Sequence, residues 1–241
     1  MIGILINRRK IDFYSKFFFR ILQCVVDPND KEILLFSIEN LNIKNKTIYG
    51  NLITVDNINP INTSIPKIIF NFSRENSKIK KRKIRLLAEY ENTILINESN
   101  TFNQEVISEI LASNQDTNVF RLPDLLKSCK CKNIITVYMQ KNIEGKWIPI
   151  LGTDDLAKKI TESSVMLADY VSNFISRLGF CTISFIIDKE GSLYLISFEG
   201  FDIKHIAFVN NHKMQNKFMN NIFNYAKYLS INQEEVIGFV D

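Results

Sequence analysis

The densest chemical feature of the sequence is a run of positive charge. Six cations lie within eight residues: Lys78, Lys80, Lys81, Arg82, Lys83 and Arg85. Such a run suits contact with an anionic partner, such as nucleic acid, polyglutamate or an acidic protein. The alternative is a solvated loop that leads into a helix, with little effect on stability. No aromatic RNA-binding motif accompanies the run, which argues against nucleic acid.

The other residues with reactive side chains form no recognisable motif. Cys129 and Cys131 are separated by one residue, whereas a zinc knuckle uses two, and only His205 and His212 could complete a site. Neither histidine has a carboxylate or cysteine at a spacing typical of acid-base or metal chemistry. No serine lies in the context of a nucleophile elbow. With four cysteines in the chain, we expect reduced thiols rather than a disulfide framework.

The composition is that of one large globular domain or two small ones. The chain has 241 residues, of which 46% are hydrophobic and 23% charged, and its net charge is +4. These values exclude wholesale disorder and a coiled-coil rod. No segment reaches the ~20 apolar residues that a membrane span requires, and the apolar run at residues 1–7 is too short for a signal peptide. We expect a soluble, cytoplasmic protein.

The first half of the sequence alternates between predicted strands and helices. An alternating, hairpin-like stretch surrounds Gly50 at residues 46–55. Strands are predicted at residues 2–6, 32–37, 66–72 and 93–97, and helices at 13–24, 84–90 and 104–112. This alternation favours an α/β lobe with a largely parallel sheet.

The second half is patterned differently. Two hairpins are predicted, over residues 133–151 and 181–198. A long helix over 156–178, capped by Asp154 or Asp155 and ended by Gly179, lies between them, and a last helix covers 213–228. This pattern favours an α+β lobe. We therefore expect two domains, residues 1–127 and 128–241.

The order of several short segments resembles the YheC/YheD-like family of endospore coat-associated proteins, in the ATP-grasp superfamily. The matching segments are Ile2-Gly-Ile-Leu, Ile48-Tyr-Gly50, residues 66–74, Ile96-Asn97 with Phe102-Asn103, Arg121-Leu-Pro123, Met139-Gln-Lys-Asn142 with Gly145-Lys-Trp147, and residues 187–196. The resemblance implies a pre-ATP-grasp-like α/β lobe followed by a truncated ATP-grasp-like lobe of two β-hairpins with packed helices. It also implies a carboxylate-amine ligase fold, in which magnesium and ATP lie between the lobes.

The sequence departs from this family at the positions that would hold the nucleotide and the metal. Thr136 stands where the family has an arginine, and Ser184 and Ser197 stand where it has carboxylates, although Glu199 remains two residues further on. About ten residues follow Pro123 where the family has a subdomain with a nucleotide-contacting lysine and a glycine-rich loop. We therefore predict no catalytic, cofactor-binding or metal-binding residues, and no cofactor.

The resulting hypothesis is a non-catalytic, spore-coat-associated-type scaffold or interaction protein, a pseudoenzyme of the ATP-grasp superfamily. It would bind protein partners, with spore coat components among them, in the cytoplasm or at the spore coat or forespore surface. One alternative is an active ATP-dependent carboxylate-amine ligase whose ligands are displaced or supplied by a partner chain. Another is a module that binds a small molecule in the remnant cleft.

Overall fold

The computed structural model describes residues 1–25, 31–118, 120, 134–150, 158–188, 191–208 and 211–232. The chain divides into two compact units. Unit 1 comprises Met1–Ser99, Asn142–Lys146 and Asp202–Asp241, and unit 2 comprises Asn100–Lys141 and Trp147–Phe201.

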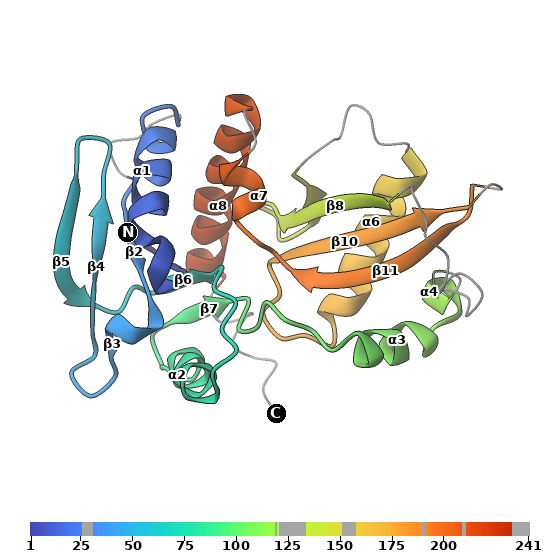
Figure 1. The fold of residues 1–241 in the computed structure, drawn as a ribbon, viewed down its shortest axis with the longest axis horizontal. Helices are drawn as coiled ribbons and strands as arrows, with labels where there is room; N and C mark the ends of the chain where they lie inside the picture. Colours follow the sequence, from blue (N-terminus) through green and yellow to red (C-terminus); the bar gives the residue numbers. More distant parts are fainter. Residues whose placement is uncertain are drawn as a thin grey trace. The chain divides into compact units, whose positions relative to one another are not determined.

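A seven-stranded mixed sheet forms the centre of unit 1 (Figure 1). Four strands are parallel, in the order β2-β1-β6-β7, and every residue in them is buried, as is typical of strands covered on both faces. Antiparallel strands β4, β5 and β3 extend the sheet beyond β2. The bounds are β1 (Ile2–Leu5), β2 (Ile33–Phe36), β3 (Leu41–Asn42), β4 (Thr47–Ile53), β5 (Ile58–Ser64), β6 (Ile68–Asn71) and β7 (Ile94–Ile96).

Helices α1 and α8 pack against each other and against this sheet. Helix α1 buries Tyr14, Phe17, Phe18 and Ile21, which recur at the three- and four-residue spacing of one helix face. Helix α8 buries Phe218, whose ring lies 6.1 Å from that of Phe72. The bounds are η1 (Arg8–Lys10), α1 (Ile11–Leu22), η3 (Ile38–Asn40), α2 (Lys78–Ala88), α7 (Lys204–Ala207) and α8 (His212–Ile231).

Unit 2 is built on an antiparallel sheet with the strand order β11-β10-β8-β9. Alternate residues of the strands, among them Val137, Ile183 and Phe198, form a core with Leu167 and Val171 of helix α6. The bounds are α3 (Gln104–Ala112), α4 (Gln115–Asn118), β8 (Ile134–Lys141), β9 (Trp147–Pro149), α6 (Lys158–Ser172), β10 (Phe180–Ile187) and β11 (Leu193–Gly200).

The predicted fold class is confirmed, with an α/β unit and an α+β unit. The division of the chain differs from the single boundary expected after residue 127. Unit 2 already begins at Asn100, and the segment from Asp202 onward returns to unit 1. The apolar pattern of α8 predicts a buried helix face, but the pattern does not identify the sheet against which that face packs. Residues 121–133, where the boundary was expected, lie outside the described part of the chain.

Gly50 does not form the predicted turn, because it lies inside the continuous strand β4. A Cβ atom at this position would lie 2.6 Å from the backbone oxygen of Leu35 in β2. The glycine therefore permits a close approach of two strands. The turn follows the strand, where the Thr54 hydroxyl accepts hydrogen bonds from the N–H groups of Asp56 and Asn57.

The long helix predicted over 156–178 is shorter in the structure, since α6 ends at Ser172 and Arg177 has a φ of 54°. The predicted caps Asp154 and Asp155 lie outside the described residues. The described residues include no helix suited to crossing a bilayer; α8, with twenty residues, carries three lysines.

Candidate functional site

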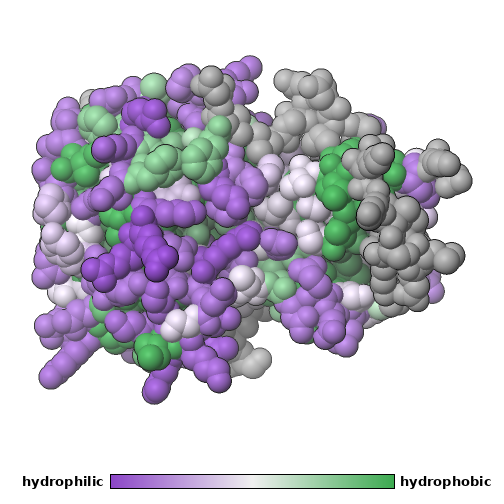
Figure 2. Space-filling view, viewed as in Figure 1, coloured by the Kyte–Doolittle hydropathy of each residue, from purple (hydrophilic) through white to green (hydrophobic). Residues whose placement is uncertain are grey.

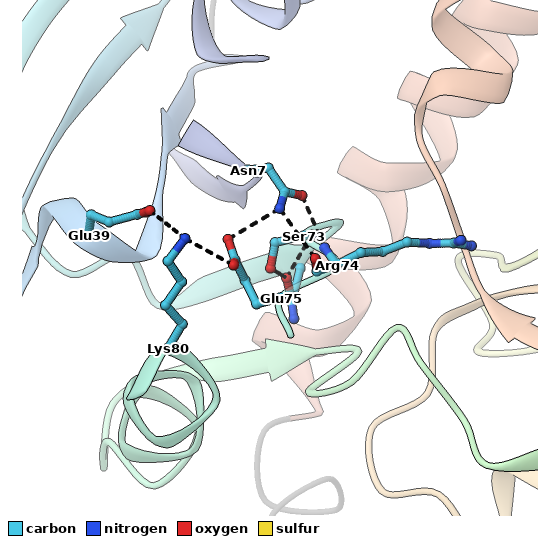
Figure 3. Close-up of polar contacts among 7 residues, drawn as sticks. Asn7, Glu39, Ser73, Arg74, Glu75 and Lys80 are labelled. Carbon is cyan, nitrogen blue, oxygen red and sulfur yellow. Dashed lines mark hydrogen bonds and ion pairs between the residues drawn. The ribbon is translucent and has the colours of Figure 1, made fainter. Parts of the chain in front are cut away.

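The carboxyl ends of the parallel strands in unit 1 carry a cluster of polar side chains (Figure 3). Asn7 follows β1, Asn71 ends β6 and Asn97 follows β7. The chain leads from β1 to β2 on one side and from β6 to β7 on the other, so the strand order reverses between β1 and β6. Open α/β sheets bind their ligands at such a point, beyond the carboxyl ends of the strands. This edge is therefore the candidate site of unit 1.

Two asparagines fix the loop that follows β6. Asn7 Oδ1 accepts a hydrogen bond from the Arg74 N–H at 3.1 Å, and its Nδ2 donates to Glu75 Oε1 at 3.2 Å. Asn71 accepts from the backbone N–H and the hydroxyl of Ser73, at 2.9 and 2.6 Å, and donates to the Asn97 carbonyl at 2.8 Å. Asn97 has a φ of 59°, which asparagine tolerates better than most residues. The edge is thus held by a dense local network.

Lys80 completes this network from helix α2. Its Nζ lies 2.7 Å from Glu39 Oε1 and 3.1 Å from Glu75 Oε2, and the Glu75 side chain is only 6% exposed. Burial alone would raise the pKa of Glu39, but hydrogen bonds and the charge of Lys80 outweigh it and lower that pKa. Hydrogen bonds from Lys80 to Glu39 and Glu75 raise the pKa of Lys80. Lys80 therefore acts as an internal counter-ion.

Arg74 extends away from this network, as Figure 3 shows, and belongs to a second group of charges in unit 1. Burial would raise the pKa of Asp202, but hydrogen bonds from Lys204 and the charges of Lys204 and Arg74 lower it. Burial, with a contribution from Asp202, raises the pKa of Tyr14 to about 12. The group thus combines an ionised carboxylate with a neutral phenol and two cations.

Helix α2 carries all six cations of the basic run, so the run is helical rather than a loop. Lysine and arginine favour helices, and the buried residues Ile84 and Leu87 hold the helix on unit 1. Lys78, Lys81, Arg82 and Arg85 are exposed, and Lys83 is half-buried. The expectation that these side chains contribute little to stability is a prediction for measurement, and Lys80 is the residue of the run that pairs with both Glu39 and Glu75.

The sheet of unit 2 presents a row of hydroxyl groups on the face opposite its core. Ser184 of β10 pairs in register with Thr136 of β8 on one side and with Ser197 of β11 on the other. The Thr136 and Ser184 oxygens lie 3.1 Å apart. These are the three positions at which the family resemblance implies an arginine and two carboxylates. Thr136, Ser184 and Ser197 are neighbours in the sheet, but their side chains carry no charge.

The next rows of this face contain polar groups with unused hydrogen-bonding capacity. Thr182 pairs with Tyr138 and Glu199, and its hydroxyl has no hydrogen-bond partner among the described residues. Gln140 is fully buried, and neither atom of its amide has a partner in the described part of the chain. Within the same residues, no three His, Cys, Asp or Glu side chains lie close enough to hold a metal ion.

The remaining sequence candidates do not converge. His205 lies in α7 and His212 begins α8, Cys181 and Trp147 are buried in the core of unit 2, and Cys129 and Cys131 lie outside the described residues. Sequence reasoning missed the asparagine network because Asn is abundant throughout the chain. The useful signal was position, since Asn7, Asn71 and Asn97 each stand at the end of an apolar strand.

No protein-family model matches the sequence, and no curated protein is similar to it in sequence. In structure the chain is similar to D-alanine–D-alanine ligases. The enzyme from Aeromonas hydrophila gives a TM-score of 0.55 at 9% identity, over 95% of this chain and 98% of that one. The enzyme from Coxiella burnetii gives 0.56 at 8% identity, over 98% and 97%. The Bacillus anthracis enzyme complexed with ATP gives 0.51 at 10% identity, over 97% and 98%. The chain therefore shares the fold of these ligases.

Proposed function

We propose that this protein is a non-catalytic member of the ATP-grasp superfamily that acts as a scaffold or interaction protein, of the type represented by the YheC/YheD-like spore-coat-associated family. The hydroxyl row of Thr136, Ser184 and Ser197 carries the proposal. Magnesium and phosphate groups require anionic oxygens and fixed cations, respectively. Three neutral hydroxyls supply neither.

The exposed side of helix α2 is the proposed contact with an acidic protein partner. Lys78, Lys81, Arg82 and Arg85 place four cations on it, whereas Lys80 is engaged within the unit. Binding of polyglutamate to the intact protein tests this contact. It should weaken with salt and in a variant with these four residues replaced by Ser, while a Lys16→Ser, Lys217→Ser control keeps it. Equal binding by both variants would remove α2 from the proposal.

Thermal unfolding in Mg-ATP tests the absence of nucleotide chemistry. A ligand at about one hundred times its Kd stabilises the folded state by about 2.7 kcal/mol, which is a visible shift. We expect no shift with millimolar Mg-ATP. The matched comparison is a variant in which Asp replaces Ser184 and Glu replaces Ser197, because it places two carboxylates opposite each other on β10 and β11. Its thermal unfolding with and without Mg-ATP is measured beside that of the unmodified protein.

The rival function is an ATP-dependent carboxylate-amine ligase with displaced or partner-supplied ligands. Two features of the same face favour it: Glu199, and the Gln140 amide, which has no hydrogen-bond partner among the described residues. In that case the unmodified protein should show a Mg-ATP shift that disappears in a Glu199→Gln variant. That result would overturn the proposal of a non-catalytic protein.

A further inference from the structure

Unit 1 contains a cavity of about 420 Å³ between the end of α1 and the segment formed by α7 and the start of α8. Its volume lies within the range of small-molecule sites, about 300 to 1,000 Å³. Its apolar lining includes Phe17, Ile21 and Phe208, and its polar lining includes Arg20, Cys24 and His212.

The apolar part of this cavity includes an unusually exposed aromatic ring. Phe208 is 71% exposed and stacks on Phe13, itself 42% exposed, with ring centroids 5.4 Å apart. Phe17 and Ile21 are buried, at 1% and 3% exposure, and form the inner wall. In Figure 2 a hydrophobic area lies over α1 and α8 within a largely hydrophilic surface. Stacked aromatic rings beside a cavity provide a surface on which another ring can pack.

The polar part of the cavity contains a fixed positive charge, the guanidinium of Arg20. Arg20 and His212 line this part, and among the described residues of the lining there is no carboxylate. Helices α1 and α8 together carry five Lys or Arg and a single acid, Asp12. His212 also begins a twenty-residue helix, whose amino end carries partial positive charge. This second basic surface arises from two helices far apart in the sequence, so the charge run in α2 gave no sign of it.

We propose that this cavity binds a small organic anion with an apolar ring, such as an aromatic carboxylate or an aryl phosphate. The acid group contacts Arg20 and His212, and the ring packs between Phe17 and Phe208. The guanidinium of Arg20 is permanently charged and can donate two parallel hydrogen bonds to such a group. None of the lining residues belongs to α2 or to the sheet of unit 2, so the inference is independent of the proposed function.

Cys24 provides a direct readout, because its exposed thiol lines the cavity. The full chain is alkylated with iodoacetamide, and the modification of the peptide containing Cys24 is followed by mass spectrometry. Sodium benzoate and phenyl phosphate are the anionic probes, and benzyl alcohol and benzylamine are the neutral and cationic controls. At about 5 mM, an anion with a Kd of about 1 mM should slow alkylation about sixfold, and the controls should not.

Two variants with exposed side chains test the assigned contacts. Arg20→Gln should raise the Kd of both anions about tenfold, which lowers the protection at 5 mM from about sixfold to about 1.5-fold. Lys16→Gln, one turn earlier on α1 and outside the lining, should preserve the sixfold protection. Phe208→Ala should also weaken the protection of Cys24 by both anions. Whichever of the two anions protects Cys24 more strongly identifies the preferred acid group, carboxylate or phosphate. Absence of protection by both anions, equal protection by benzyl alcohol, or protection that survives Arg20→Gln would each overturn the proposal.

Discussion

Lys80 and Lys81 are adjacent in the sequence but have different roles in the molecule. Lys80 bridges Glu39 and the nearly buried Glu75, whereas Lys81 is exposed. A buried carboxylate without its partner pays the full cost of desolvation, and hydrogen bonds to charged groups contribute about 1.5 to 3 kcal/mol. The functional meaning of a charge run therefore depends on each residue's contacts.

The two lysines give a matched pair of stability measurements. Lys80→Ala should lower the free energy of unfolding by about 1 to 2 kcal/mol, because Glu75 loses its cation. Lys81→Ala should change it by less than about 0.5 kcal/mol. Urea denaturation of both variants measures the difference. Equal effects would mean that the Lys80 ion pairs do not contribute to stability.

The same network predicts a pH dependence. The folded-state pKa of Glu39 lies below its ordinary value of 4.5, so its stabilisation is present above that pH and is lost as pH falls through the lowered pKa. The pKa of Lys80 lies above its ordinary value of 10.5, so its stabilisation is present below that pH and is lost as pH rises through the raised pKa.

The difference in unfolding free energy between the unmodified protein and Lys80→Ala should thus be largest near neutral pH. It should shrink in acid below the ordinary Glu39 value and in base above the ordinary Lys80 value. Urea titrations at pH 3, 7 and 11 check this expectation. A difference that stays constant across these pH values would rule out titration of the ion pairs as its source.

At the scale of the elements, strand β4 depends on Gly50. A methyl group there would lie 2.6 Å from the Leu35 carbonyl, so Gly50→Ala must separate β4 from β2. We expect a loss of about 2 to 3 kcal/mol by thermal or urea unfolding. Gly191→Ala is the comparison, because an added Cβ there meets no described atom within 4 Å and only the φ of 80° is unfavourable for alanine. This backbone conformation should cost about 1 kcal/mol of stability. A smaller loss at Gly50 than at Gly191 would contradict the close approach.

The positions of most elements were predictable from the sequence, because buried parallel strands such as Ile33–Phe36 are continuous apolar runs and the period of α1 is clear. Gly50 misled the prediction because glycine marks both turns and close strand contacts. The start of α2 was missed because exposed lysines give no apolar period. The candidate site was less predictable, since Asn7, Asn71 and Asn97 meet only through the parallel order of three strands.

At the scale of the whole molecule, the core of unit 1 includes the far end of the sequence. Phe218 of α8 is fully buried beside Phe72. Phe218→Ala should therefore lower stability by about 3 to 5 kcal/mol. In amide hydrogen exchange, it should accelerate β1 and β6 rather than β10 and β11. Faster exchange confined to β10 and β11 would instead place α8 in unit 2, as the expected domain of residues 128–241 implies.

The return of α8 to unit 1 has a consequence for synthesis. A ribosome releases residues 1–99 first, yet their sheet lacks the helix that covers β6 until residues up to Ile231 have emerged. All of unit 2 lies between residues 1–99 and α8 in the sequence, so it leaves the ribosome earlier than α8. Domains generally fold in the order of their synthesis, but here the first segment made is the last to be completed. The apolar surface that α8 covers therefore lacks this helix throughout translation of unit 2.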